Sequence, residues 1–198
     1  METLTSNEAN DLLDLAKNTI ELKVKTPLFN KSILLANNKI DKKIKMLIKI
    51  FYKPTNTLIN EIYTPGENNV AYEVVDALVS LFKKTDENIF LKESIINNID
   101  IEIYTFSEFK PLGKNSIERL KNFNLEKDNL FIKYGIKQNF IFTINNKNLN
   151  KLSKTALLET ACTKIGLPEY YWKQTKVNLF KFEAKGYKKD EFGRVVNL

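Results

Sequence analysis

Two hydrophobic periods follow one another along this chain, and their order limits the folds open to it. Between Ile44 and Tyr52 every second residue is apolar, with Lys45 and Lys49 among the positions between, which is typical of a strand with one buried face. Between Val70 and Lys84 apolar residues recur at helical spacing instead. The same patterns predict further helices over Asp11–Val24 and Leu152–Ile165, and further strands over Thr57–Tyr63, Ile99–Phe106, Leu130–Ile144 (a hairpin) and Val177–Lys185. Hairpin-like neighbours dominate, so we expect an α+β fold with largely antiparallel sheets and flanking helices.

Length and composition indicate a protein that folds without covalent or metal staples. Of its 198 residues, 43% are hydrophobic, enough for the core of one domain (residues 1–198) or of two closely packed lobes. Cys162 is the only cysteine, which excludes an intrachain disulfide and a cysteine-based zinc cage. The absence of histidine excludes Ser-His-Asp and Cys-His catalysis and histidine metal sites. A reaction would depend on carboxylates, lysines, tyrosines, Cys162 or a cofactor, and the sequence predicts no cofactor.

The N-terminal residues and the charge bear on location and partners. The segment from Met1 to Asp11 has neither a basic flank nor an apolar run, and no stretch approaches the length of a membrane-spanning helix. We therefore expect a cytoplasmic protein without membrane contact. The net charge is +7 and comes almost wholly from lysine, because Arg119 and Arg194 are the only arginines. Since readers of nucleic acids favour arginine, the charge alone does not identify a nucleic-acid-binding protein.

Two groups of side chains near the C-terminus are candidates for function, and each also has a structural explanation. Tyr170, Tyr171 and Trp172 stand among lysines and would stack on single-stranded bases if exposed. Otherwise they would cover the edge of a core. Cys162 would be a nucleophile if Lys164 lowered its pKa, but we favour a small hydrophobic residue facing the core.

Known motifs for metals and nucleotides are absent from the sequence. The six glycines form neither a dinucleotide fingerprint nor a P-loop. Acidic residues between Glu61 and Glu87 would suit a hard cation only if the fold gathered them, and their spacing matches no known calcium loop. We therefore interpret them as solvated surface charge and predict no metal site.

The C-terminal part carries a more specific pattern. Leu157 to Trp172 reads LLETACTKIGLPEYYW, and a strand pattern follows it. This resembles the end of the AMMECR-one domain family, in which a helix ending in a Lys-Ala-Gly-Leu-Pro-like element precedes a tryptophan and a strand. Here that element is KIGLP, Lys164 to Pro168. The earlier helices and strands also occur in the family's order, so the resemblance covers nearly the whole chain and implies two packed α+β lobes.

The hallmark of that family is not kept. The family has Leu-Arg-Gly-Cys-Ile-Gly in its second strand, whereas the aligned segment here is LINEIY, Leu58 to Tyr63. Asn60 and Tyr63 stand where glycines would let a ligand approach the backbone. A second family arginine is missing after Asp86. The resemblance thus makes Leu58, Asn60, Glu61, Tyr63 and Asp86 candidate binding residues, but it does not imply that any family chemistry is retained.

These observations lead to three hypotheses about function. The first is a divergent, non-catalytic AMMECR-one-like protein that binds a protein partner through the altered segment. The second is binding of RNA or single-stranded DNA through lysines and the Tyr170–Trp172 aromatics, with strong salt dependence. The third is an accessory enzyme of protein or nucleic-acid modification that uses Cys162 or a carboxylate.

Overall fold

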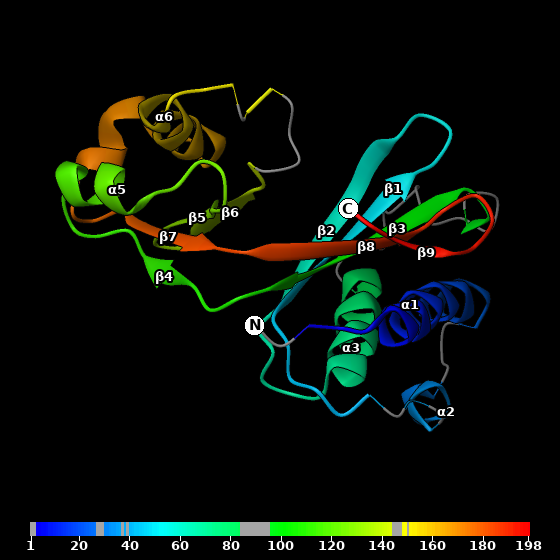
Figure 1. Cartoon of the computed structure of the whole chain (residues 1–198). Coiled ribbons are helices and arrows are strands. Elements are labelled where there is room, and N and C mark those ends of the chain that lie inside the picture. Colours follow the sequence, from blue (N-terminus) through cyan, green and yellow to red (C-terminus); the bar gives the residue numbers. More distant parts are fainter. Residues whose placement is uncertain are drawn as a thin grey trace. The chain divides into compact units, whose positions relative to one another are not determined.

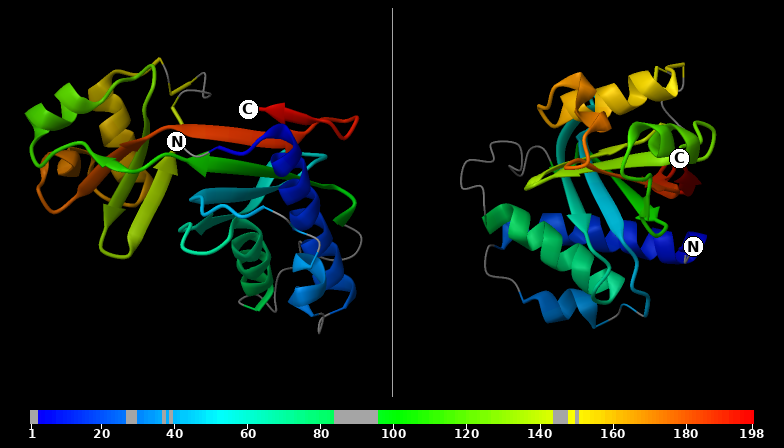
Figure 2. Two further views of the ribbon diagram at one scale, coloured as in Figure 1. Left: turned by 60° about the horizontal axis from the view of Figure 1, so that its bottom comes forward. Right: turned by 90° about the vertical axis from the view of Figure 1, so that its left-hand side faces the viewer.

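The computed structural model describes residues 3–26, 30–36, 38, 40–83, 96–143, 148–149 and 151–198. The chain divides into two units. One is the continuous stretch Phe106–Ala184, and the other combines the chain up to Thr105 with Lys185–Leu198. Each unit has a largely antiparallel sheet with helices against it (Figure 1, Figure 2), so the predicted α+β class is confirmed.

The discontinuous unit is built on a five-stranded sheet in the order β2-β1-β3-β8-β9. Its strands are β1 (Met46–Tyr52), β2 (Thr57–Thr64), β3 (Ile99–Phe106), β8 (Ala184–Lys189) and β9 (Val195–Asn197). β1 pairs antiparallel with both β2 and β3, so that Ile48 lies opposite Ile62 and Ile103. β2 forms one edge of this sheet, and its register with β1 shifts between Ile50 and Phe51.

Helices cover one face of this sheet. They are α1 (Ser6–Lys25), α2 (Lys31–Leu35) and α3 (Val70–Lys83). α1 begins with a capping box, in which Thr5 Oγ1 accepts from the Glu8 amide and the Glu8 carboxylate accepts from the Thr5 amide. α1 and α3 lie side by side beneath the strands in Figure 1. Leu12 of α1 and Val74 of α3 are fully buried in one core with Ile48 of β1, as their hydrophobic periods predict.

The continuous unit is built on a four-stranded sheet in the order β4-β7-β5-β6. Its elements are β4 (Lys110–Pro111), α5 (Ser116–Asn122), β5 (Asn129–Tyr134), β6 (Lys137–Ile141), α6 (Lys154–Lys164), the 3-10 helix η2 (Glu169–Lys173) and β7 (Asn178–Phe182). One sheet face contributes Leu130 and Ile132 to a core shared with Leu157 and Leu158 of α6. Odd residues of β5 face the other way, where the Phe131 ring stacks on Phe140 with centroids 4.7 Å apart.

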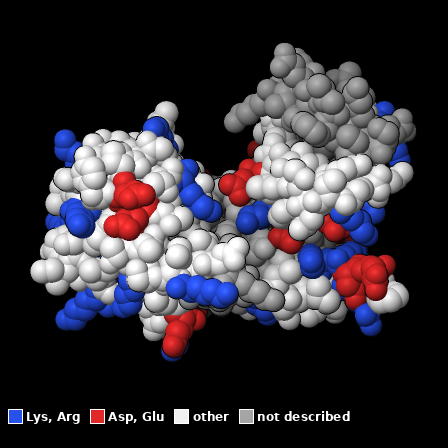
Figure 3. Space-filling model, turned by 90° about the horizontal axis from the view of Figure 1, so that it is seen from above, with Lys and Arg blue, Asp and Glu red and all other residues white. Residues whose placement is uncertain are grey.

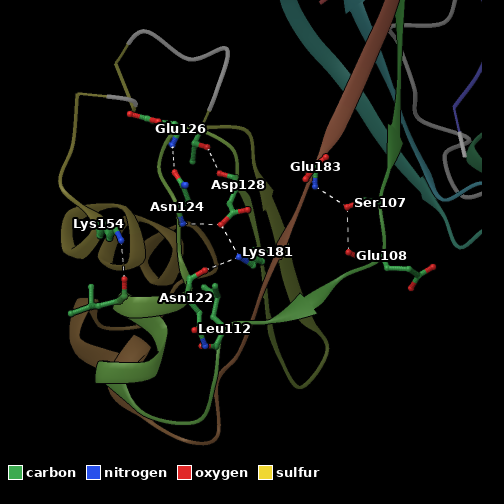
Figure 4. Close-up of polar contacts among 12 residues, drawn as sticks. Ser107, Glu108, Leu112, Asn122, Asn124, Glu126, Asp128, Lys154, Lys181 and Glu183 are labelled. Carbon is green, nitrogen blue, oxygen red and sulfur yellow. Dashed lines mark hydrogen bonds and ion pairs between the residues drawn. The ribbon is translucent and has the colours of Figure 1, made fainter. Parts of the chain in front are cut away.

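Polar contacts fix the loop between α5 and β5 to β7 (Figure 4). Asp128 Oδ2 accepts from the Asn124 amide at 2.8 Å and from Lys181 Nζ at 3.2 Å. Lys181 Nζ also donates to the Asn122 carbonyl at 2.8 Å. Because Asp128 is buried, Lys181 serves this internal contact and does not belong to a freely exposed basic face.

The C-terminal end is where the prediction was least accurate. The single strand expected over Val177–Lys185 is two strands, β7 and β8, which belong to different sheets. The residues after Gly186, for which no strand was predicted, complete β8 and form β9. Tyr187 is only 1% exposed and its hydroxyl donates to the Leu4 carbonyl at 3.0 Å. One buried tyrosine among lysines therefore fixes a segment whose composition suggests solvent exposure.

Candidate functional site between β2 and α3

The turn that joins β2 to α3 is tightly determined. Gly66 has a φ of +73°, and a Cβ there would lie 2.7 Å from the Lys45 amide nitrogen. The Glu73 carboxylate, in the first turn of α3, accepts from the amides of Gly66, Glu67 and Asn68 at 2.7–2.9 Å. Glu73 is buried and these three donors satisfy its charge. α3 is therefore held at a fixed angle beside the edge strand.

A groove of about 470 Å³ opens between β2 and α3. One side consists of strand and turn residues, and the other of residues from successive turns of the helix. The lining residues are Asn60, Glu61, Ile62, Tyr63, Thr64, Pro65, Asn68, Tyr72, Glu73, Asp76, Ala77, Ser80 and Leu81. The segment that the sequence resemblance marked thus forms one wall of a concave surface.

The structure separates the five candidate binding residues of that segment. Asn60, Glu61 and Tyr63 line the groove, whereas Leu58 does not and is 44% exposed near the hairpin end. Asn60 pairs with Ile50, a core residue of β1, so it lies on the sheet face that packs on the helices. Glu61 and Tyr63 lie on the opposite face, because alternate strand residues point to opposite sides. Asp86 lies outside the described residues.

The groove is acidic, although the protein as a whole is basic. Its lining includes the carboxylates of Glu73 and Asp76 on α3, whereas Glu61 belongs to the lining with its side chain on the other face of β2, and none of these described lining residues is a lysine or an arginine. Lys31, at the start of α2, forms an ion pair with Asp76 beside the groove. Both partners are substantially exposed, so this pair is weak and can exchange with another cation.

One polar atom at the end of β2 has no partner. Thr64 is 2% exposed and lines the groove, yet its Oγ1 has no hydrogen bond to any described residue. A buried hydroxyl without a partner costs about 1–3 kcal/mol relative to a satisfied one. This cost is a local feature of the groove that the sequence did not reveal.

The aromatic candidates near the C-terminus do not form a three-ring platform. Tyr170 is 57% exposed and Tyr171 is half-buried, with ring centroids 5.3 Å apart. Trp172 is 2% exposed and belongs to the core of the continuous unit, so the stacking role assigned to it is wrong. The structural explanation applies to Trp172, because its side chain belongs to the core that also contains Leu157 and Cys162.

Arg119 explains why this segment is fixed. Its guanidinium is buried and donates to the backbone carbonyls of Gly113, Trp172, Gln174 and Val177. Burial lowers the pKa of Arg119 from its usual value. One of the two arginines therefore holds a loop. On the face drawn in Figure 3, the lysines and arginines of each unit stand among acidic and uncharged side chains.

Cys162 is not suited to nucleophilic chemistry. It is 0% exposed on α6, within the core of the continuous unit, as the favoured interpretation predicted. Burial raises the pKa of the Cys162 thiol to about 11. The thiol is therefore protonated at neutral pH and shielded from solvent, so of the two groups named for the enzyme hypothesis Cys162 does not fit, and a carboxylate is left.

The described part of the chain also bears on metal binding and on membrane crossing. No group of three or more Asp, Glu or Cys side chains there could hold a metal ion. None of the helices in those same ranges combines the length and the apolar character needed to cross a lipid bilayer.

Comparison with known proteins supports the fold alone. No protein-family model matches the sequence, and neither does any curated protein. Among solved structures, the chain is similar to the crystal structure of an uncharacterized protein from Pyrococcus horikoshii, with a TM-score of 0.77. The two are 17% identical, and the match covers 98% of each chain. The α+β fold of this chain therefore also occurs in a solved structure.

The helical wall of the groove was missed from the sequence. Tyr72, Asp76 and Ala77 belong to the polar side of α3, which the hydrophobic pattern predicts only as solvent-facing. A usable signal did exist. On the side of β2 that faces the helices, Asn60 and Thr64 are polar. Polar residues at such positions indicate that the strand and the helix are not in full apolar contact.

Proposed function

We propose that this protein is a divergent, non-catalytic member of the AMMECR-one family that acts in the cytoplasm by binding a protein partner in the β2–α3 groove. The observation that carries the proposal is the groove itself. The segment aligned with the family hallmark, Leu58 to Tyr63, supplies four of its lining residues, opposite α3. This position supports a binding surface that lies where the family hallmark lies but consists of different residues.

The chemistry of the lining favours binding over catalysis. The lining offers hydroxyl groups, such as those of Thr64 and Ser80, and carboxylates, but no described lining residue is a histidine, cysteine or lysine. The carboxylate of Glu73 is already committed to three backbone amides. A nucleic acid would be repelled from this groove, because its phosphates would face carboxylates. A protein surface with polar and cationic groups suits it better.

The test is capture of partners from the native host by the tagged protein after nuclease treatment. Ala77→Arg places a long side chain in the groove from α3, and we expect it to abolish capture of a stoichiometric protein partner. Ile136→Arg adds the same side chain at a fully exposed turn of β5–β6 and should capture that partner like the wild type. Equal capture by the groove variant would refute the proposal.

Nucleic-acid binding remains a second candidate, on a smaller surface than the sequence predicts. The supporting observation is the exposed ring of Tyr170 beside the half-buried Tyr171, with Lys173 and Lys176 exposed nearby. Single-strand binding by these groups predicts an affinity for oligothymidylate that falls steeply with salt and about tenfold with Tyr170→Ala. Binding that is absent at low salt, or that ignores Tyr170→Ala, would eliminate this candidate.

A further inference from the structure

The net charge of the protein belongs to one of its two units. The continuous unit, Phe106–Ala184, contains 14 of the 31 lysines and arginines but only 7 of the 24 acidic residues, so its formal charge is +7. The rest of the chain has 17 residues of each sign and is neutral. Within the continuous unit Arg119 is buried and Lys181 pairs with Asp128, which leaves 12 lysines and 6 carboxylates. This excess favours a polyanionic ligand for the continuous unit.

Three tyrosine rings follow one another on this unit, from the end of β5 to η2. The Tyr134 ring meets the Tyr171 ring edge-on, with centroids 6.2 Å apart, and the Tyr171 and Tyr170 centroids are 5.3 Å apart. Tyr134 and Tyr171 are half-buried and pack against the core of the unit, whereas Tyr170 is 57% exposed. The two inner rings therefore support the outer one, which is open to stack on a nucleic-acid base.

Lysines lie beside these rings. Lys137 is the partner of Tyr134 across the β5–β6 hairpin, so the two side chains share one face of the sheet. The Lys137 ammonium lies close to Gly166, since a Cβ on that glycine would be 3.6 Å from Lys137 Nζ. Lys173 Nζ lies 5.5 Å from the centre of the Trp172 ring in η2. One cation from the hairpin and one from η2 thus accompany the three rings.

The α6–η2 connection adds a third cation. Lys164 is exposed at the end of α6, two residues before Gly166. The single carboxylate in the connection is that of Glu169, which is exposed at the start of η2. None of the three lysines forms an ion pair with a described residue. We call this surface the tyrosine patch; it consists of Tyr134, Tyr170 and Tyr171 with Lys137, Lys164 and Lys173.

The chemistry of the tyrosine patch favours a single strand bound without base preference. An exposed ring stacks on the face of a base, and a duplex keeps those faces inside its helix. Arginine forks usually read base edges, but Arg119 is the only arginine of the unit and donates to backbone carbonyls in the interior. Lysine instead meets phosphate as a point charge. An acidic protein segment would match the charge but would not need the open ring of Tyr170.

We infer that the continuous unit binds single-stranded RNA or DNA on the tyrosine patch, without base preference and independently of the β2–α3 groove. This inference rests on the second candidate function and specifies its site. A base stacks on Tyr170, and neighbouring phosphates lie against Lys137, Lys164 and Lys173. Because the rest of the chain is neutral, the electrostatic attraction comes from this unit alone.

Fluorescence anisotropy of the full-length protein with labelled twelve-nucleotide RNA strands is the test. Strands of uridylate, cytidylate and mixed sequence should bind within about fivefold of one another, and a duplex of the mixed sequence about tenfold more weakly, since its bases cannot reach Tyr170. The logarithm of the affinity should fall with the logarithm of the salt concentration with a slope of about −2, as expected for three phosphate contacts. The same strands made as DNA distinguish the source, because the tighter of the two identifies RNA or DNA as the ligand.

Variants separate the stacking contact from the charges. Tyr170→Ala should weaken binding about tenfold at every salt concentration and leave the slope unchanged, because stacking releases no counterions. Lys137→Gln and Lys173→Gln should each reduce the steepness of the slope by about 0.7. The matched controls are Phe192→Ala, which removes a ring that is 73% exposed, and Lys17→Gln, which removes an exposed lysine. Both lie in the neutral unit and should leave affinity and slope unchanged.

A gain of affinity is also expected. Glu169→Gln removes the carboxylate of the α6–η2 connection and should tighten binding about threefold at low salt, which a misfolded variant would not do. Binding that is absent at low salt, a duplex bound as tightly as the single strand, or equal losses for Phe192→Ala and Tyr170→Ala would each overturn the inference. So would competition by polyglutamate at the concentrations at which unlabelled oligouridylate competes, because the occupant would then be an acidic protein segment.

The outcomes also separate this inference from the functions proposed above. If Tyr170→Ala weakens binding but both lysine variants keep the full slope, nucleic-acid binding stands and the tyrosine patch is wrong. If Tyr170→Ala has no effect, both are lost. Ala77→Arg changes the β2–α3 groove alone and should bind oligouridylate like the wild type. Loss of oligouridylate binding in Ala77→Arg would place the strand in the groove and overturn the inference.

Discussion

The Thr64 hydroxyl is the residue-scale feature with the clearest energetic consequence. It is buried and lacks a hydrogen-bond partner among the described residues, so it contributes a desolvation cost without a compensating bond. Valine has nearly the same shape without the polar atom. We expect Thr64→Val to raise the free energy of unfolding by about 1 kcal/mol, measured by urea denaturation with an unchanged m-value.

Thr143 provides the matched control for that substitution. It is equally buried, but its hydroxyl donates to the Asp128 carbonyl at 2.6 Å. Thr143→Val should lower the free energy of unfolding by about 1–2 kcal/mol, because it leaves a buried carbonyl unsatisfied. A decrease of similar size for Thr64→Val would mean that its hydroxyl is hydrogen-bonded in solution.

The state of Cys162 is a second prediction at this scale. The pKa of about 11 and complete burial leave the thiol both protonated and inaccessible at pH 8. We therefore expect a chromogenic disulfide reagent to release less than a tenth of one equivalent from the native protein within an hour, and one equivalent after denaturation in guanidinium. Stoichiometric reaction within minutes in the native state would show that Cys162 is an accessible thiol and would make it the candidate nucleophile of the enzyme hypothesis.

At the scale of elements, the β2–α3 connection depends on Gly66. An alanine there would meet both an unfavourable positive φ and the backbone of Lys45, so we expect Gly66→Ala to lower the free energy of unfolding by about 3 kcal/mol. Gly193 has a similar φ of +77°, but a Cβ there meets nothing within 4 Å. Gly193→Ala should therefore cost only about 1 kcal/mol. Equal losses in thermal or urea unfolding would show that the turn accommodates a side chain.

The same elements show what the sequence can and cannot predict. The alternation in β1 and the helical period in α3 are local signals, and both elements form where the patterns place them. The groove is not local. It depends on the pairing of Asn60 with Ile50, which decides the face of each β2 residue, and on the Glu73 contacts that fix the helix. Neither is encoded in the period of a single segment.

At the scale of the whole chain, the division into units runs against sequence order. The strand pattern over Val177–Lys185 is continuous, yet β7 and β8 pair with different sheets. Hydrophobic alternation describes which face of a strand is buried and contains no information about its neighbours. The family resemblance implied two lobes, and the chain does divide into two units. It did not imply that the last residues, Lys185–Leu198, belong to the unit that contains the N-terminal part of the chain.

This discontinuity leads to a prediction about fragments. The unit Phe106–Ala184 is continuous and has its own core around Leu157, Cys162 and Trp172, so we expect it to fold alone and to unfold cooperatively.

A fragment ending at Thr105 lacks β8 and β9. It would lose the buried Tyr187 with its bond to Leu4, and would leave β3 without a neighbour on one side. In NMR spectra, we expect well-dispersed amide proton resonances from the fragment Phe106–Ala184 and poorly dispersed ones from the fragment that ends at Thr105. Adding the peptide Lys185–Leu198 should restore dispersion to the second fragment if β8 completes its sheet. Cooperative folding of that fragment without the peptide would mean that α1, α2, β1, β2 and α3, together with β3, already bury enough surface to be stable.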